Sequence, residues 1–303
     1  MEKKNWIVTL QRGSYLEKCK ENGATTVRIA VEGYSVRTAG CFQKEEIDSL
    51  IARFHSLDLK WEIVFNRLWM EEELEEMIAA MEQIARWNPD GIVYMDPAVY
   101  MEACELGIED RLIYSPDTLM TNASDIQSML DLGIRRVVLA AEITMDEIMK
   151  ITAKLPSDKV ELQIHGRQVM SYSRRMLVSN YLDYAHKTVE NLHERKDLYL
   201  VESTRTGKMP IIETEYGSAV YMDSTLCSIE EIVSLCDAGL THFFIDSMFS
   251  TDQEMIHALR SYQEVIRGAD PEIVMNALRK MYPALNYGKG YYYTKTNLTK
   301  EDC

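Results

Sequence analysis

Three features of the sequence predict an α/β fold, namely a (β/α)8 barrel of the TIM type with a β insertion between its seventh and eighth strands. Short apolar runs alternate with amphipathic helical stretches, there are eight such runs, and glycines mark most helix ends. This alternation is typical of a parallel sheet, and eight βα units close more naturally into a barrel than into an open doubly wound sheet, which remains the alternative. At 303 residues, the chain has the length of a barrel that forms a single domain, residues 1–303.

The predicted strands are short and the stretches between them have a helical period. Apolar side chains recur every three or four residues, as at Leu74, Met77, Ile78, Met81 and Ile84, so each helix is expected to bury one face against the sheet. The strands are predicted at residues 6–10, 27–31, 61–65, 92–95, 112–114, 137–140, 160–164 and 242–245.

Helix boundaries are predicted from capping residues. A hydroxyl followed three residues later by Glu or Gln indicates a capping box at a helix start. A glycine before the next strand indicates a left-handed residue at a helix end. The boxes are Ser124/Gln127, Thr144/Glu147, Ser228/Glu231 and Thr251/Glu254, and the glycines are Gly23, Gly91, Gly107, Gly133 and Gly239.

The interval between the seventh and eighth predicted strands is much longer than the others. It contains two further strand-like runs, at residues 198–202 and 209–213. We interpret residues from about 166 to 224 as a β-rich excursion from the barrel rather than as a second domain. A short C-terminal tail is expected from about residue 283 to 303.

Charge and cysteine content restrict the classes of function. The chain has 33 Lys and Arg against 48 Asp and Glu, a net charge of −15, which disfavours binding to nucleic acid unless basic residues cluster locally. We find no apolar run of membrane-spanning length and no export signal, so we expect a cytoplasmic protein. The cysteines lack the tight spacing of zinc sites and are interpreted as reduced thiols: Cys19, Cys41, Cys104, Cys227, Cys236 and Cys303.

Candidate site residues are the polar side chains that follow the predicted strands, because barrel enzymes carry their active sites at the carboxyl ends of the strands. We predict Glu142, His165 and Asp96 as catalytic groups and expect no metal ligands. Substrate binding is predicted for Arg37, Asn66, Asn122, Arg167 and Asp246, and Gln11, Ser115 and Asp117 belong to the same wider set.

The residue types suggest particular roles at such a site. Arg37 and Arg67 suit the bidentate binding of a carboxylate or phosphate, whereas Asp96, Glu142 and Asp246 suit a base. An imidazole such as that of His165 serves as an acid, base or metal ligand near neutral pH. The alternative for all of them is structural: the side chains cap loops, pair with one another or, for His165, form buried hydrogen bonds.

Familiar catalytic motifs are missing from the sequence. We find no G-x-S-x-G, H-E-x-x-H, G-x-G-x-x-G or P-loop pattern, so neither a hydrolase triad, a zinc protease nor a nucleotide site is indicated. Arg167, Arg174 and Arg175, with Tyr172 between them, form a local basic cluster that suits an anion or an RNA phosphate. An ion-paired loop is the alternative.

Several segments, taken together and in order, resemble the peptidase U32 family. They are residues 34–40 (Tyr-Ser-Val-Arg-Thr-Ala-Gly), Asn66, Asp96, residues 115–122 and residues 138–142 (Val-Leu-Ala-Ala-Glu). The most specific match begins with His165-Gly166 and ends with Ser179-Asn180-Tyr181, like the signature of that family. The resemblance covers most of the chain and implies a barrel.

The resemblance also implies that this chain holds no iron–sulfur cluster. In cluster-bearing relatives the signature contains two cysteines, and the corresponding residues here are Val169 and Met176. Only Cys227 matches a cluster cysteine, and no cysteine lies between Ser179 and Leu200. One thiolate is too few for a [4Fe–4S] cluster, which takes four.

Function is inferred from the same resemblance. The short, cluster-free chain is similar to the smaller subunit of the family's two-protein tRNA wobble-uridine hydroxylases, which use prephenate and form 5-hydroxyuridine. This implies an accessory subunit whose partner is a longer, cluster-bearing U32 paralogue and which contacts tRNA indirectly. Two alternatives remain: a collagenase-like peptidase, as the family name implies, and a non-catalytic barrel in which Arg37, Arg67 and Arg167 hold a small dicarboxylate such as prephenate.

Overall fold

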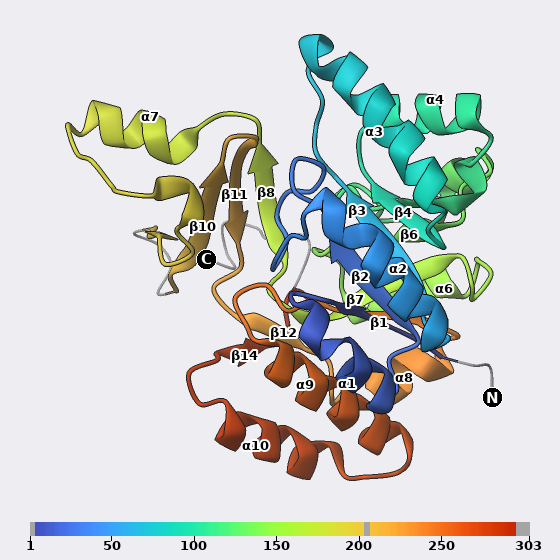
Figure 1. Cartoon of the computed structure of the whole chain (residues 1–303). Helices are drawn as coiled ribbons and strands as arrows, with labels where there is room; N and C mark the ends of the chain where they lie inside the picture. Colours follow the sequence, from blue (N-terminus) through green and yellow to red (C-terminus); the bar gives the residue numbers. More distant parts are fainter. Residues whose placement is uncertain (1–3, 203–206, 295–303) are drawn as a thin grey trace.

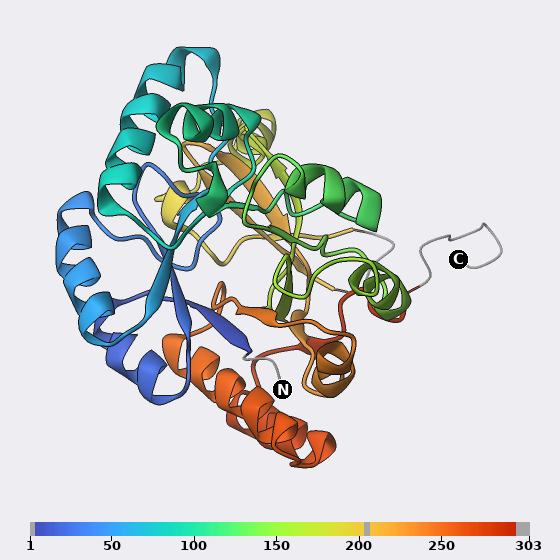
Figure 2. The ribbon, with the colours of Figure 1, turned by 90° about the vertical axis from the view of Figure 1, so that its right-hand side faces the viewer.

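The computed structural model describes residues 4–202 and 207–294, and their centre is a closed barrel of parallel strands (Figures 1 and 2). Each strand pairs in parallel with the next along the chain, and β13 pairs with both β7 and β1, which closes the sheet. The predicted barrel is therefore confirmed. Its strands are β1 (Asn5–Thr9), β2 (Thr26–Ala30), β3 (Lys60–Phe65), β4 (Gly91–Tyr94), β5 (Leu112–Tyr114), β6 (Arg136–Val138), β7 (Val160–Gly166) and β13 (His242–Ile245).

Helices cover the outside of the barrel, as Figure 2 shows. In α3 the side chains that face the sheet are Met77, Ala80, Met81 and Ile84, whereas Ile78 is 40% exposed. The predicted apolar face of this helix is therefore correct except at Ile78. The covering helices are α1 (Leu16–Glu21), α2 (Ile47–Ser56), α3 (Leu74–Trp87), α4 (Pro97–Leu106), α5 (Ala123–Leu130), α6 (Met145–Thr152), α8 (Ile232–Asp237), α9 (Asp252–Ile266) and α10 (Pro271–Met281).

Helix caps agree with the sequence in part. Thr144 and Glu147 form the expected capping box at α6, and the hydroxyl of Thr251 caps α9. The box predicted at Ser124 is wrong, because Asn122 caps α5 and places Ser124 inside its first turn. The box at Ser228 is also wrong, since that hydroxyl donates to the carbonyl of Ile164.

One predicted glycine cap is also wrong. The C-terminal cap of α3 is Asn88, which adopts a left-handed φ of 56°, and Gly91 is instead the first residue of β4. The other helix-end glycines, such as Gly107 with a φ of 66°, have the expected left-handed backbone.

The predicted excursion is a second, smaller sheet beside the barrel mouth. Its antiparallel strands lie in the order β8 (Val169–Ser173), β11 (Gly217–Tyr221), β10 (Met209–Thr214) and β9 (Tyr199–Leu200), and they carry the helix α7 (Leu177–Tyr184). The short strand β12 (Thr225–Cys227) then returns the chain to the edge of β7, and β14 (Tyr287–Gly288), near the C-terminus, pairs with β12. Figure 1 shows this lobe projecting to one side of the barrel.

The excursion is attached to the barrel by contacts between an arginine side chain and aromatic rings, and by ion pairs. The guanidinium of Arg67 lies 4.0 Å from the ring centroid of Trp69 and 3.9 Å from that of Tyr216, which belongs to the turn between β10 and β11. Arg67 also pairs with Glu73 at 2.6 Å. From the excursion, Arg174 reaches the same carboxylate at 2.9 Å. The expectation that Arg67 holds a ligand is thus wrong, because its side chain is buried in this contact.

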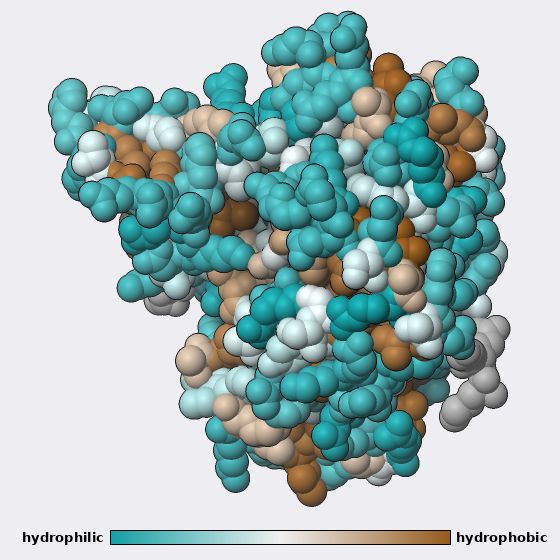
Figure 3. All heavy atoms as spheres, viewed as in Figure 1, coloured by the Kyte–Doolittle hydropathy of each residue, from teal (hydrophilic) through white to brown (hydrophobic). Residues whose placement is uncertain are grey.

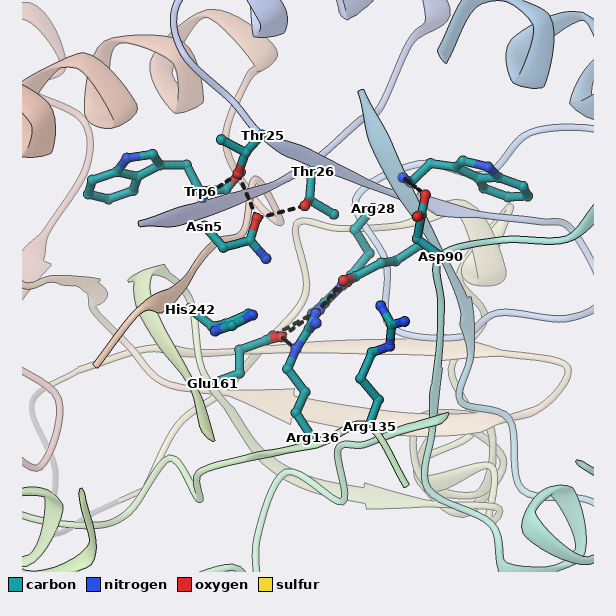
Figure 4. A network of polar contacts seen from close by, with 12 residues as sticks. Asn5, Trp6, Thr25, Thr26, Arg28, Asp90, Arg135, Arg136, Glu161 and His242 are labelled. Carbon is teal, nitrogen blue, oxygen red and sulfur yellow. Dashed lines mark hydrogen bonds and ion pairs between the residues drawn. The ribbon is translucent and has the colours of Figure 1, made fainter. Parts of the chain in front are cut away.

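Four charged side chains fill the barrel interior toward the amino ends of the strands, away from the mouth (Figure 4). Arg28 contacts Glu62 at 2.6 Å and Glu161 at 2.9 Å, and Arg136 contacts Glu161 at 2.7 Å and also pairs with Glu62. All four residues are at most 3% exposed. Burial by itself raises the pKa of Glu62, but Arg136 and Arg28 outweigh it and hold that pKa at about 2.

Among residues 4–202 and 207–294, none of the helices combines the length and the apolar character needed to cross a bilayer.

Removing one charge from this interior quartet should destabilise the fold strongly. We expect Glu161→Gln to lower the free energy of unfolding by about 3–5 kcal/mol, because the two arginines would keep an uncompensated buried charge. The measurement is urea denaturation. Glu17→Gln, which breaks the exposed pair of Glu17 with Arg53, is the control and should cost less than about 1 kcal/mol. Similar losses for both variants would contradict this account of the interior.

Candidate functional site

The barrel mouth holds a small cavity of about 100 Å³ at the carboxyl ends of the strands, lined by both polar and apolar side chains. Four predicted binding residues, Arg37, Asn66, Arg167 and Asp246, line it together with residues of the excursion. The excursion therefore forms one wall of the site. The polar lining consists of Thr9, Arg28, Arg37, Thr38, Asn66, Ser115, Asp117, Gln163, Arg167, Gln168, Tyr221 and Asp246.

Arg37 is held in place from several directions. It follows β2 and has a left-handed φ of 60°, which is uncommon for a residue other than glycine. Its guanidinium pairs with Asp117, lies 4.5 Å from the ring centroid of Tyr172 in β8, and donates to the sulfur of Met95 at 3.2 Å. The Arg37 side chain is only 3% exposed. The site thus contains a preorganised cation that is already neutralised by one carboxylate.

Asp246 lies in the cavity, and the pKa of its carboxyl group differs from the ordinary value. It follows β13, and one carboxylate oxygen accepts a hydrogen bond from the Thr9 hydroxyl at 2.9 Å. Burial raises the pKa of Asp246 above its ordinary value, despite the lowering effect of the Thr9 hydrogen bond. A carboxyl group with a raised pKa in a cavity is suited to accepting or donating a proton. Asp246 is therefore the acid–base candidate of this mouth.

Several buried polar atoms around the mouth lack a partner among the described residues. They are Nε of Arg37, Nε of Arg167, Oε1 of Gln168 and the hydroxyl of Tyr221. Another nitrogen of Arg167 donates to the carbonyl of Met222 at 2.8 Å, and burial lowers the pKa of Arg167. An unsatisfied buried polar group costs about 1–3 kcal/mol, so such a cluster indicates a place that a polar ligand satisfies. Two arginines and a phenol suit oxygen-rich, anionic ligands.

Three predicted site residues lie outside the cavity, so the structure does not bring them to the mouth. Asp96 caps α4 through the backbone N–H of Ala98 and also accepts the N–H of Trp69. Asn122 is exposed and caps α5. Glu142 is exposed and does not line the cavity. Asp96 and Asn122 therefore have a structural role, because each side chain accepts one or more hydrogen bonds from backbone N–H groups at the start of a helix.

His165 is also misplaced for a catalytic role at the mouth, because it is fully buried in the barrel wall. Its Nε2 lies 2.8 Å from the carboxylate of Glu254 in α9, and its Nδ1 lies 3.2 Å from the hydroxyl of Tyr262. The Tyr287 hydroxyl donates to the same carboxylate at 2.7 Å. Burial lowers the pKa of His165, but Glu254 outweighs it and raises that pKa to about 10. The histidine thus joins β7, α9 and the C-terminal segment.

The cavity includes residues that the sequence did not identify. Tyr221 ends β11, Gln168 precedes β8 and Thr9 ends β1. Thr9 had the same signal as the predicted residues, a polar side chain at a strand end. Tyr221 and Gln168 had no such signal, because they reach the mouth only through the folding of the excursion over it.

The positions that correspond to cluster cysteines do not form a cluster site here. Val169 lines the mouth, and Met176 directly precedes α7. Cys227 is 1% exposed, and its sulfur contacts that of Met275 at 3.6 Å. Within the described part of the chain, no group of three or more His, Cys, Asp or Glu side chains is arranged to hold a metal ion. The side chains present do not fit an iron–sulfur cluster, and Cys303 lies outside the described residues.

The His165–Glu254 pair should make stability depend on pH. The folded pKa of His165, about 10, exceeds its ordinary value of 6.5, so the stabilisation is complete below pH 6.5 and is lost as pH rises through 10. The loss should not exceed about 1.4 kcal/mol per pH unit. Urea denaturation across this range measures it. Glu254→Gln should remove this component, and an unchanged pH profile in that variant would contradict the assignment.

Comparisons with known proteins give the family of the chain. It is 29% identical over 268 residues to tRNA hydroxylation protein P2 of Bacillus subtilis, covering 88% of this chain and 86% of that protein. It is 27% identical over 162 residues to tRNA hydroxylation protein P of Escherichia coli. That alignment covers 53% of this chain but only 36% of the relative. It is 23% identical to tRNA hydroxylation protein P1 of Bacillus subtilis, covering 85% of this chain and 63% of that protein.

A solved structure has the same fold. The U32 peptidase Mk0906 superposes with a TM-score of 0.52 at 11% identity, covering 80% of this chain and 92% of the other. The sequence model of the family described as peptidase family U32 matches residues 13–302. The match extends over nearly the whole barrel, the excursion and the mouth, so the chain belongs to peptidase family U32.

Proposed function

We propose that this chain acts in the cytoplasm in the hydroxylation of tRNA wobble uridine to 5-hydroxyuridine, as an accessory subunit beside a longer U32 paralogue. The similarity to tRNA hydroxylation protein P2 over 86% of that protein supports the reaction class. The two-subunit arrangement is supported by the similarity to P1 of the same bacterium, of which this chain covers only 63%. The longer paralogue would supply the iron–sulfur chemistry, for which residues 4–202 and 207–294 of this chain hold no ligand set.

The observation that carries the proposal is the polar mouth. Arg37, Arg167, Gln168 and Tyr221 line a cavity of about 100 Å³, and each has a buried polar atom without a partner among the described residues. A small dicarboxylate such as prephenate has the negative oxygens that Arg37 and Arg167 would bind. In this site Arg37 and Arg167 orient the acid, Tyr221 donates a hydrogen bond to it, and Asp246 accepts or returns a proton.

A peptidase mechanism is suggested by the family name, but the residues that line the mouth do not support it. His165, the histidine that follows a barrel strand, faces Glu254 and Tyr262 in the wall and does not line the cavity. Among the residues that line the cavity, none is a histidine or a cysteine. Ser115 therefore has no imidazole beside it within the cavity lining, as a Ser–His nucleophile requires.

A complementation experiment tests the reaction. Deleting the gene should abolish 5-hydroxyuridine at the wobble position, measured by mass spectrometry of digested tRNA. Arg37→Met and Tyr221→Phe should restore the modification poorly, with initial rates roughly tenfold or more below wild type. Glu142→Gln should restore it fully, because Glu142 is exposed and lies outside the cavity.

The same experiment tests whether this chain and the longer U32 paralogue are both required for the modification. Deleting the gene for the longer U32 paralogue should abolish the modification just as completely. Normal 5-hydroxyuridine after deletion of this gene would overturn the proposal, and full modification by this chain without the paralogue would overturn the accessory role.

Ligand binding at the mouth is tested separately by thermal unfolding with prephenate. At a concentration about 100 times Kd, prephenate should stabilise the fold by about 2.7 kcal/mol, which raises Tm by several degrees. Arg167→Met should abolish this shift, whereas Glu142→Gln should retain it. A shift that Arg37→Met and Arg167→Met both leave intact would place the ligand elsewhere.

A further inference from the structure

The helix α7 presents an apolar and aromatic stripe to solvent. Leu177, Tyr181 and Tyr184 are spaced by four and three residues, so they lie on one side of the helix, and they are 41%, 60% and 85% exposed. On the adjoining side, Val178 and Leu182 are only partly buried. No residue of this helix is fully buried. In Figure 3 hydrophobic residues reach the surface over α7, on the lobe that projects from the barrel.

A buried carboxylate holds this helix in place, although its apolar packing is slight. Glu213 in β10 is fully buried, and it accepts hydrogen bonds from the backbone N–H groups of Val178 at 2.8 Å and Ser179 at 3.1 Å. It also accepts from the hydroxyl of Ser218 at 2.7 Å. Four hydrogen bonds to one carboxylate, including that from the Ser179 hydroxyl, position the start of α7 firmly. The exposed stripe is therefore displayed in a defined orientation.

The charge of the excursion differs from that of the remaining chain. Residues 166–224 contain eight Lys and Arg and eight Asp and Glu, so the whole net charge of −15 resides outside the excursion. Arg175 and Lys187 flank α7, are exposed, and form no side-chain hydrogen bond or ion pair with the described residues. Asp183 is the single acidic residue of the helix. A polyanion therefore meets less repulsion here than on the rest of the protein.

We propose that the outer face of α7 binds single-stranded RNA, with bases stacked on Tyr181 and Tyr184 and phosphates beside Arg175 and Lys187. The inference rests on the proposed tRNA reaction, and it replaces the expectation that this chain contacts tRNA only indirectly. Exposed tyrosines offer planes on which any base stacks, and nearby cations neutralise the backbone. RNA is favoured over a protein partner because two of the three stripe residues are tyrosines and the flanking cations have no ion-pair partner in the described part of the chain.

The location of α7 agrees with this proposal. The helix follows β8 directly, and β8 lines both the mouth and a neighbouring hollow of about 420 Å³. That hollow shares Asp117 and Val169 with the mouth cavity and is also lined by Tyr114 and Tyr172. RNA held on the excursion would thus lie on the lobe that forms one wall of the reacting site.

The test is fluorescence anisotropy with the full chain and a labelled, unmodified anticodon stem-loop RNA. Tyr181→Ala and Tyr184→Ala should each weaken binding roughly tenfold, whereas Tyr181→Phe, which keeps the ring, should bind like wild type. Arg175→Gln and Lys187→Gln should each lower the slope of log affinity against log salt by about 0.7. Ile273→Ala removes a 69% exposed side chain on α10 and is the matched control, with no expected effect.

The outcomes separate this inference from the proposed function. If the chain does not bind the RNA, or if both alanine variants bind normally, the inference is wrong, even where the variants restore 5-hydroxyuridine in cells. If the alanine variants keep RNA affinity but lose association with the purified longer paralogue, the stripe is a protein interface and the RNA proposal is overturned. Failure of the mouth variants in cells, in contrast, concerns only the reaction.

Discussion

The buried quartet of two arginines and two glutamates is the interaction on which the rest of the barrel depends. Arg28, Glu62, Arg136 and Glu161 come from β2, β3, β6 and β7, so their contacts cross the barrel interior. Arg28 also stacks on Phe244 in β13, with 4.3 Å between its guanidinium carbon and the ring centroid. Charges of this kind are costly to bury and stable only as a complete set. The quartet lies between the mouth cavity, which Arg28 lines, and a second hollow of about 370 Å³ at the amino ends of the strands, which Glu62 and Arg136 line.

The mouth depends in turn on how the excursion is attached. Stacked arginines, Arg67 beneath Tyr216 and Arg37 beneath Tyr172, join the lobe to barrel loops. Cation–π contacts of this type are strongest when they are desolvated, as for Arg67, which is 2% exposed. The excursion brings Tyr221 and Gln168 over the strand ends. The same attachment therefore closes one side of the mouth and supplies part of the cavity lining.

Residues that resemble the family signature have structural uses in this chain even though the cluster ligands are absent. His165 connects β7 with α9 through Glu254, and Ser179 belongs to the hydrogen-bonded start of α7. Val169, at a position of a cluster cysteine, instead forms part of the apolar lining of the mouth. Among the described residues, no ligand set for an iron–sulfur cluster is assembled, which agrees with the proposed accessory role.

The sequence by itself determined the barrel, its strand positions and the excursion, because those depend on local period and on where apolar runs begin and end. It also placed Arg37, Asn66, Arg167 and Asp246 at the mouth, since polar residues at the ends of parallel strands converge there. Only the tertiary structure decided the rest. His165, Asp96 and Arg67 have the residue types of a site but point to neighbouring elements, whereas Tyr221, Gln168 and the stripe on α7 acquire their positions from the folding of the excursion. A one-dimensional pattern specifies which residues end a strand, but the direction of each side chain depends on the elements that pack beside it.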